Sequence, residues 1–150
     1  MKSYQDIARR CLKDEADAVM ALIQNIDSEF DRAVDIILNC KGKVIVTGVG
    51  KSGHIGVKIA ATMSSTGTPA FYINPLDVYH GDLGVIAKGD VILAISNSGQ
   101  TDELLRFVPY IKNEGFPLIA MTGNPDSLLA KSSDCILNSH VSSEACPLNL

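Results

Sequence analysis

The sequence predicts a three-layer α/β/α sandwich built on a five-stranded parallel sheet and preceded by an N-terminal helical hairpin. From about residue 41 onward, short β-branched runs alternate with helical patterns, which is typical of a parallel sheet with helices on both faces. The runs contain few polar residues, as strands buried on both sides require. A length of 150 residues suits one such domain.

Residues 4–40 carry helical periodicity. The first apolar face gathers five side chains, at Ile7, Cys11, Ala18, Leu22 and Ile23. Ser28 is a suitable N-cap for a second helix, whose apolar stripe comprises Phe30, Ala33, Val34, Ile37 and Leu38. Residues 1–40 are therefore expected to form a helical hairpin ahead of an α/β core over residues 41–150, all within one domain.

The core elements follow in strict order. Strands are predicted over residues 43–50, 70–74, 90–96, 117–123 and 134–137, and helices over residues 52–65, 101–113 and 126–131. Residues 75–83 read as a polar loop or a short helix. Because ligands of such sheets bind at the carboxyl ends of the strands, the residues that directly follow each strand are the candidates for chemistry.

Composition excludes several classes of function. The net charge is −4 and no Lys or Arg cluster occurs, so a nucleic-acid partner is not expected. No apolar run reaches the ~18 residues of a membrane span, and the charged N-terminus lacks a signal-peptide core. The four cysteines match no zinc spacing. These features predict a cytoplasmic protein with reduced thiols and no membrane partner.

A glycine-rich turn follows the first predicted strand. Gly50 allows a tight turn, and the next helix directs its backbone N–H groups toward an anion. Lys51 adds a positive charge and Ser52 a hydroxyl. The turn is not a Walker A loop, and Asn74 ends the second strand where a dinucleotide site has an acid. A plain helix-capping turn is the alternative interpretation.

A second polar turn follows the third predicted strand. It runs through Ser96, Asn97 and Ser98 to Thr101, again into a helix start. One such turn usually means capping, but two at the carboxyl ends of one sheet favour a phosphate-ester site. We expect Gly50, Ser52 and the polar residues of this second turn to bind a phosphate.

Five segments together give a specific resemblance. Residues 50–56, 65–69, 80–84, 95–99 and 144–147 (GKSGHIG, STGTP, HGDLG, ISNSG and EACP) resemble the arabinose-5-phosphate isomerases, a family of SIS-type phosphosugar isomerases. The resemblance implies an SIS-type fold and interconversion of D-ribulose 5-phosphate and D-arabinose 5-phosphate, which supplies the sugar Kdo for lipopolysaccharide or capsule. It also implies a sugar-phosphate ligand, no cofactor, and a homo-oligomer, either a dimer or a tetramer.

The resemblance also implies catalytic roles. Lys51, Glu103 and Glu144 match active-site positions of the family, with Glu144 as the base and Lys51 stabilising an enediolate. Glu103 would assist ring opening or proton exchange. His80 would contact substrate or bind an inhibitory metal, and no metal is expected to be required. Plain alternatives exist: Glu103 suits any helix start, and Lys51 suits any solvated turn.

Two departures leave the function open. Gln100 stands where the family usually has glutamate, and the sequence stops before the helix and the His-Pro-Gly-Gly segment that the family adds, so the C-terminal part is expected to be missing. A non-catalytic phosphosugar-binding or sensing module therefore remains an alternative, because fold does not decide function. An isomerase for a hexulose phosphate is a third possibility, although residues 80–84 argue against it.

Overall fold

A five-stranded parallel sheet forms the centre of the molecule. The computed structural model describes residues 3–143, 145 and 146. The strands run in the order β2-β1-β3-β4-β5, and every neighbouring pair is parallel. Their bounds are Val44–Gly48 (β1), Ala70–Ile73 (β2), Val91–Ile95 (β3), Leu118–Thr122 (β4) and Cys135–Asn138 (β5). The predicted sheet is confirmed, with each strand close to its expected place.

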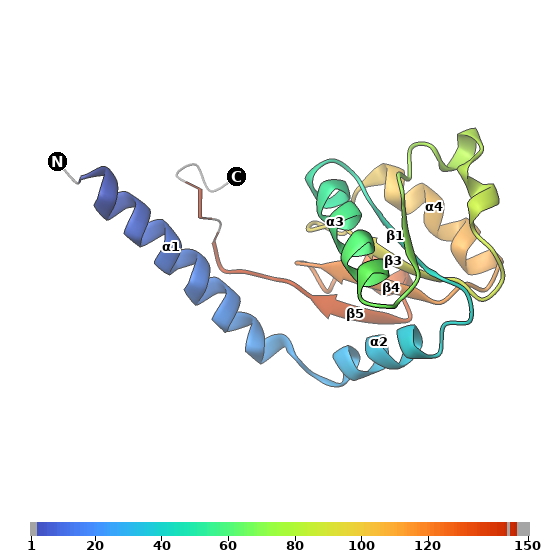
Figure 1. Cartoon of the computed structure of the whole chain (residues 1–150), viewed down its shortest axis with the longest axis horizontal. Coiled ribbons are helices and arrows are strands. Elements are labelled where there is room, and N and C mark those ends of the chain that lie inside the picture. The colour runs from blue at the N-terminus through green and yellow to red at the C-terminus, as the bar shows by residue number, and fades with distance from the viewer. Residues whose placement is uncertain (1–2, 144, 147–150) are drawn as a thin grey trace.

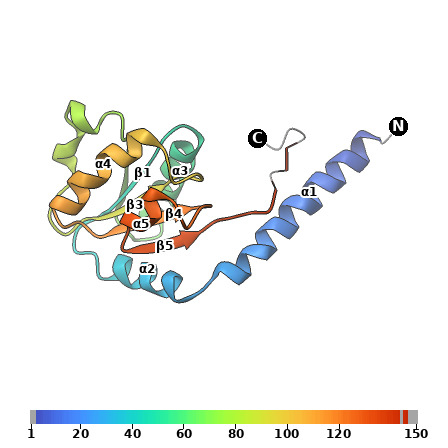
Figure 2. The same cartoon turned by 180° about the vertical axis from the view of Figure 1, so that it is seen from behind.

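Helices cover both faces of this sheet, so the predicted three layers are also confirmed (Figures 1 and 2). One face packs against α2 (Ser28–Leu38) and α3 (Lys51–Ser65). The other packs against α4 (Asp102–Asn113) and α5 (Leu128–Ser132). The segment after β2 completes the second layer with two short 3₁₀ helices, η2 (Val78–His80) and η3 (Asp82–Val85).

The two core clusters alternate along the strands. Ile45 and Ile92 belong to the cluster under α4, whereas Val44, Val46 and Leu93 belong to the cluster under α2 and α3. Every residue of β1 and β3 is buried. Successive side chains of a strand point to opposite faces, so an apolar strand is stabilised only where helices cover both sides, and this explains the continuous apolar runs.

The N-terminal arm differs from the expected hairpin. Both helices are present, α1 over Tyr4–Ala21 and α2 after the short η1 (Leu22–Asn25). However, α1 extends away from the α/β unit instead of lying along α2 (Figures 1 and 2). No residue of α1 is buried. Periodicity predicts an apolar stripe but not what covers it, and among the described residues no segment buries this one.

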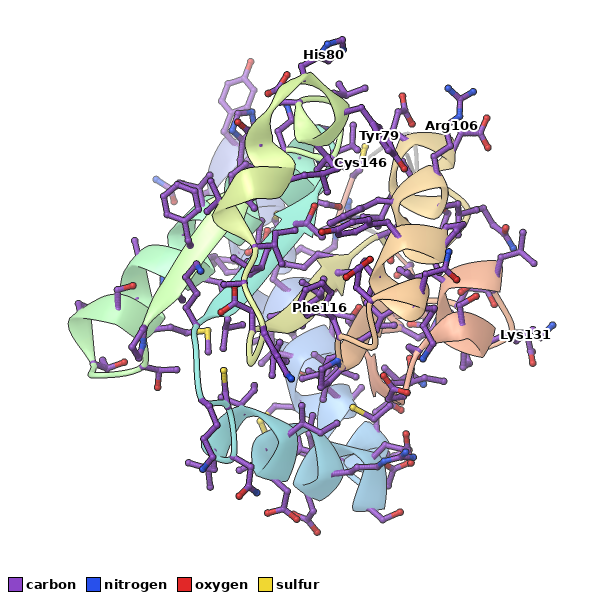
Figure 3. The ribbon with its side chains drawn as sticks, turned by 90° about the vertical axis from the view of Figure 1, so that its right-hand side faces the viewer. Tyr79, His80, Arg106, Phe116, Lys131 and Cys146 are labelled. Atoms are coloured by element: carbon purple, nitrogen blue, oxygen red, sulfur yellow. The ribbon has the colours of Figure 1, made fainter. Side chains whose placement is uncertain are left out.

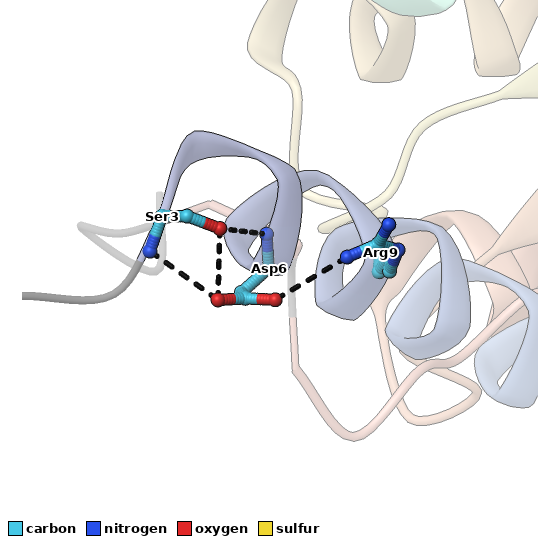
Figure 4. A network of polar contacts seen from close by, with 3 residues as sticks. All are labelled: Ser3, Asp6 and Arg9. Atoms are coloured by element: carbon cyan, nitrogen blue, oxygen red, sulfur yellow. Dashed lines mark hydrogen bonds and ion pairs between the residues drawn. The ribbon is translucent and has the colours of Figure 1, made fainter.

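Local contacts nevertheless define where α1 begins. The Ser3 hydroxyl accepts a hydrogen bond from the Asp6 amide at 3.1 Å, and the Asp6 carboxylate accepts from the Ser3 amide in return (Figure 4). Arg9 adds an exposed ion pair to Asp6 at 3.4 Å. This reciprocal capping box satisfies two amides that a helix start otherwise leaves without partners.

No helix among the described residues combines the length and the apolarity that crossing a membrane requires.

A buried carboxylate braces the amino-terminal edge of the sheet. Asp90 is 1% exposed, and it accepts hydrogen bonds from the Lys43 amide, the Ala87 amide and the Lys43 ammonium at 2.8–2.9 Å. Burial alone would raise the pKa of Asp90, but these donors outweigh it and hold the pKa below its ordinary value. Asp90 therefore ties the start of β1 to the turn before β3.

Replacing Asp90 tests this brace. Asp90→Asn should lower the free energy of unfolding at pH 7 by about 2 kcal/mol, because hydrogen bonds to a buried charged group are lost. An acid whose pKa is lowered by folding adds stability that is present above its ordinary pKa of 3.8 and is lost as the pH falls through the lowered value. Urea unfolding should show the wild type and the variant converging below that pH.

Asp14→Asn, on the exposed arm, is the matched control and should leave stability unchanged. An equal deficit of Asp90→Asn at pH 7 and in acid would contradict the role assigned to the Asp90 charge.

Candidate functional site

The candidate site lies where the order of the strands reverses. From β1 the chain crosses to β2 on one side, whereas β3 lies on the other side of β1. The register pairs Gly48 at the end of β1 with Ile95 at the end of β3. The two polar turns found in the sequence therefore leave the sheet side by side and enter α3 and α4. Such a switch point is where open parallel sheets bind ligands.

The first turn enters α3 through an unusual backbone conformation. Gly50 is the N-cap residue, with φ 60° and ψ −126°, and no side chain caps the helix. Only glycine adopts this region readily. Gly48 is equally constrained, because a Cβ there would lie 2.9 Å from the Ile95 carbonyl oxygen. Lys51 is exposed and forms no ion pair among the described residues, so its ammonium group is available to a ligand.

The second turn is shaped by its own hydroxyls. Ser96 is buried, and its Oγ lies 2.9 Å from the Thr101 hydroxyl and accepts a hydrogen bond from the Gly99 amide at 3.1 Å. The Ser98 hydroxyl accepts from the Gln100 amide at 3.2 Å and stays exposed. No side chain caps α4. Ser96 and Thr101 therefore hold the turn, and Ser98 is the residue whose hydroxyl faces solvent.

Gly99 allows this turn to pack against its neighbours. Its φ is +61°, and a Cβ at this position would overlap the Ser127 side chain and approach Thr122 Oγ1 at 3.0 Å. The Gly99 carbonyl accepts from the Leu129 amide at 3.1 Å. The Asn97 carbonyl accepts from the Gly123 amide at 3.0 Å. The turn is thus held by β4 and by the start of α5.

The remaining predicted residues are more scattered. Glu103 lies in the first turn of α4 and is partly exposed. His80 lies on η2, where it is exposed and points outward, and Tyr79 ties this segment to α4 by donating to the Arg106 carbonyl at 2.7 Å (Figure 3). Glu144 lies outside the described residues. The structure thus brings together the two turns, while His80 comes from a separate segment.

Two residues near this edge were not anticipated. The His140 ring lies 3.1 Å from the Gly123 carbonyl through Nδ1, directly after β5. Tyr72 on β2 donates a hydrogen bond from its hydroxyl to the Gly48 carbonyl at 2.7 Å. A sequence signal for Tyr72 existed in Gly53 and Gly56, two glycines one turn apart that leave space beside a helix for a large ring.

A cavity of about 890 Å³ lies at the opposite, amino-terminal edge, between the ends of α2 and α4. Its lining includes Cys40, Lys88, Tyr110 and Phe116 but none of the predicted site residues. The uncapped helix starts and the exposed Lys51 lie at the carboxyl edge instead. Among the described residues, no three His, Cys, Asp or Glu side chains gather closely enough to hold a metal ion.

Comparison with known proteins agrees with this architecture. A parallel α/β fold with polar turns at its switch point defines a class of small-ligand-binding domains. The model of the SIS domain matches residues 37–149. The chain therefore belongs to the SIS-domain family.

Individual relatives support the closer resemblance inferred from the motifs. The chain is 52% identical to arabinose 5-phosphate isomerase KdsD of Pseudomonas aeruginosa over 143 residues, which is 95% of this chain and 44% of that protein. It is 48% identical to KpsF, an arabinose 5-phosphate isomerase of Escherichia coli, with the same coverage. The chain thus spans less than half the length of these relatives.

A solved structure extends the similarity to three dimensions. The Escherichia coli CFT073 protein c3406, in complex with arabinose 5-phosphate, superposes with a TM-score of 0.92 at 41% identity, covering 99% of this chain and 81% of that one. The resemblance to arabinose-5-phosphate isomerases is confirmed by these relatives.

Substitution of Gly99 tests how tightly the second turn is packed. Gly99→Ala should reduce the free energy of unfolding by about 3 kcal/mol, because it adds both an unfavourable φ and a steric overlap. Gly115→Ala is the control: its φ of +73° is similar, but a Cβ there meets nothing within 4 Å. This control should cost only about 1 kcal/mol. Equal losses in chemical denaturation would show that the overlap is relieved without cost.

Proposed function

We propose that this chain carries the core of an aldose–ketose isomerase that interconverts D-ribulose 5-phosphate and D-arabinose 5-phosphate. The observation that carries the proposal is the pairing of Gly48 with Ile95, which sets two helix starts without side-chain caps next to each other. Each helix start attracts a phosphate dianion through its N–H groups and its dipole. The relatives named above, one of them in complex with arabinose 5-phosphate, support the same assignment.

The phosphate is assigned to the two turns. Gly50 and Ser52 contribute from the start of α3, and Ser98 contributes from the turn before α4. Ser96, Asn97 and Thr101 support the phosphate site by keeping the second turn in shape. Gln100 is neutral, so it adds no repulsion of the dianion.

The reaction is a proton transfer through an enediol. One proton leaves C1 of ribulose 5-phosphate and one is added at C2, while O1 loses its proton and O2 gains one, so no co-reactant is needed. We assign the carbon-bound proton to Glu144 as general base. Lys51 stabilises the negative charge on the enediolate oxygen, Glu103 exchanges protons with the sugar hydroxyls, and His80 contacts the substrate. The product would supply Kdo synthesis in the cytoplasm.

The decisive experiment is isomerisation in deuterium oxide. Ribulose 5-phosphate incubated with the protein should yield arabinose 5-phosphate carrying deuterium at C2, followed by proton NMR. Glu144→Gln should slow turnover by about 100-fold or more while phosphosugar-induced ³¹P shifts remain. Glu114→Gln makes the same change at the amino edge and should leave the rate unchanged.

The second candidate function is a non-catalytic phosphosugar-binding module, favoured by Gln100 in place of the usual acid. Under that function, the ³¹P signal of the sugar phosphate would shift on binding while no deuterium entered C2. This outcome would overturn the isomerase assignment and keep the phosphate site.

We also propose that the protein associates with copies of itself into a dimer or a tetramer. Apolar side chains of α1 are exposed, among them Leu12, Val19 and Met20, which are 68%, 65% and 62% exposed. An apolar face left open in this way favours association.

Adding charge to these exposed residues tests this association. The double substitution Val19→Glu and Met20→Glu should shift sedimentation toward the monomer mass, because burying the new carboxylates is unfavourable. Asn113→Glu adds a charge at the exposed end of α4, outside α1, and should leave the mass unchanged. A wild type that sediments as a monomer would rule out the role of α1 in self-association.

A further inference from the structure

The Tyr72 side chain fits into a notch on α3. Tyr72 lies on β2, the edge strand, and its ring packs against the helix where Gly53 and Gly56 leave space. A Cβ on Gly56 would lie 3.1 Å from the ring, and one on Gly53 would lie 2.5 Å from the hydroxyl. Both glycines therefore accommodate this one side chain, whereas Gly50, with open space around it, serves the turn itself.

The Tyr72 hydroxyl reaches the end of β1, where the first turn of the candidate site begins. It donates a hydrogen bond to the Gly48 carbonyl at 2.7 Å, in a partly buried position. Burial, followed by the negative charge of Asp77, raises the pKa of Tyr72 above its ordinary value. The phenol therefore stays protonated and remains a donor at neutral pH.

The turn that this bond holds has few other restraints. Gly48 is the last residue of β1, and Lys51 begins α3 three residues later. Between them, Gly50 has no side chain, and the first hydrogen bond of the turn, from the Gly53 amide to the Val49 carbonyl, is long at 3.4 Å. The direction of the Gly48 carbonyl therefore influences how Lys51 and the first amides of α3 are presented.

We propose that Tyr72 is a positioning residue for the phosphosugar site: its hydroxyl holds the Gly48 carbonyl and thereby aims Lys51 and the start of α3 at the substrate. This inference rests on the proposed isomerase function. Tyr72 is assigned no contact with the substrate. It acts through the turn, which lies 24 residues earlier in the chain.

The geometry predicts an unequal effect on the two kinetic constants. The phosphate is shared between the α3 turn and the α4 turn, and the α4 turn has its own internal bonds through Ser96. Loss of the Tyr72 hydroxyl therefore leaves the phosphate contacts of the α4 turn intact. The Lys51 charge matters most when the enediolate forms, so kcat should fall more than KM rises.

Tyr72→Phe tests the proposal, since it removes the hydroxyl and keeps the ring in its notch. We expect kcat for ribulose 5-phosphate to fall about tenfold, the cost of one such hydrogen bond, and KM to change less than about threefold. In the ligand-free protein, amide NMR shifts should change at residues 48–53 and remain unchanged in the α4 turn. Tyr110→Phe is the control, because its hydroxyl has no hydrogen-bond partner among the described residues.

The outcomes separate this inference from the proposed function. If the wild type is active and Tyr72→Phe has wild-type kcat and unchanged shifts at residues 48–53, the positioning role is wrong and the isomerase stands. If the wild type does not turn over, the isomerase fails, and the ligand-free amide shifts still decide whether Tyr72 holds the turn. Shift changes spread across the whole sheet would indicate a general structural role and would overturn the proposal.

Discussion

The parallel pairing of β1 with β3 is the constraint on which the rest of the molecule depends. The helix after β1 returns over one face of the sheet and the helix after β3 returns over the other. Two helix starts must therefore diverge from one point, with the ends of β1 and β3 in register between them. The connection from β1 to β2 and the connection from β3 to β4 run in opposite directions across the sheet. Because crossovers between parallel strands are right-handed, α3 and α4 therefore lie on opposite faces. The polar residues of both turns meet there because the sheet brings them together.

The two edges of the sheet perform different tasks. At the amino-terminal edge, buried Asp90 and partly buried Asp134 accept hydrogen bonds from backbone amides and from a lysine each. Each oxygen of these two carboxylates accepts at least one hydrogen bond, and both carboxylates serve the fold. At the carboxyl-terminal edge, the helix starts lack side-chain caps, and Lys51 has no ion-pair partner within the described part of the chain. Polar groups are thus satisfied where the fold needs rigidity and left available where a ligand is expected.

The sequence predicted elements whose signal is local. Continuous apolar runs identify strands such as β3, and glycine or hydroxyl residues after them identify the turns. Contacts between distant segments were harder to predict from the sequence. The Tyr72–Gly48 hydrogen bond depends on the register of β1 and β2, and the stripe of α1 indicates a buried face without naming its partner. The internal use of the Ser96 hydroxyl likewise depends on the folded path of its turn. Glu144 is not among the described residues.

The glycines of α3 link this helix to the folding of its neighbour. Glycine inside a helix is less favourable than alanine by about 1 kcal/mol, and α3 contains Gly53 and Gly56 on the face that meets Tyr72. An isolated peptide with this sequence would be a poor helix former, so α3 acquires its stability from docking on β1 and β2. Edge strand, helix and first turn therefore belong to one cooperative unit. A local opening that releases β2 would also release Lys51, which makes the rate of hydrogen exchange in β2 a measure of how often the site itself comes apart.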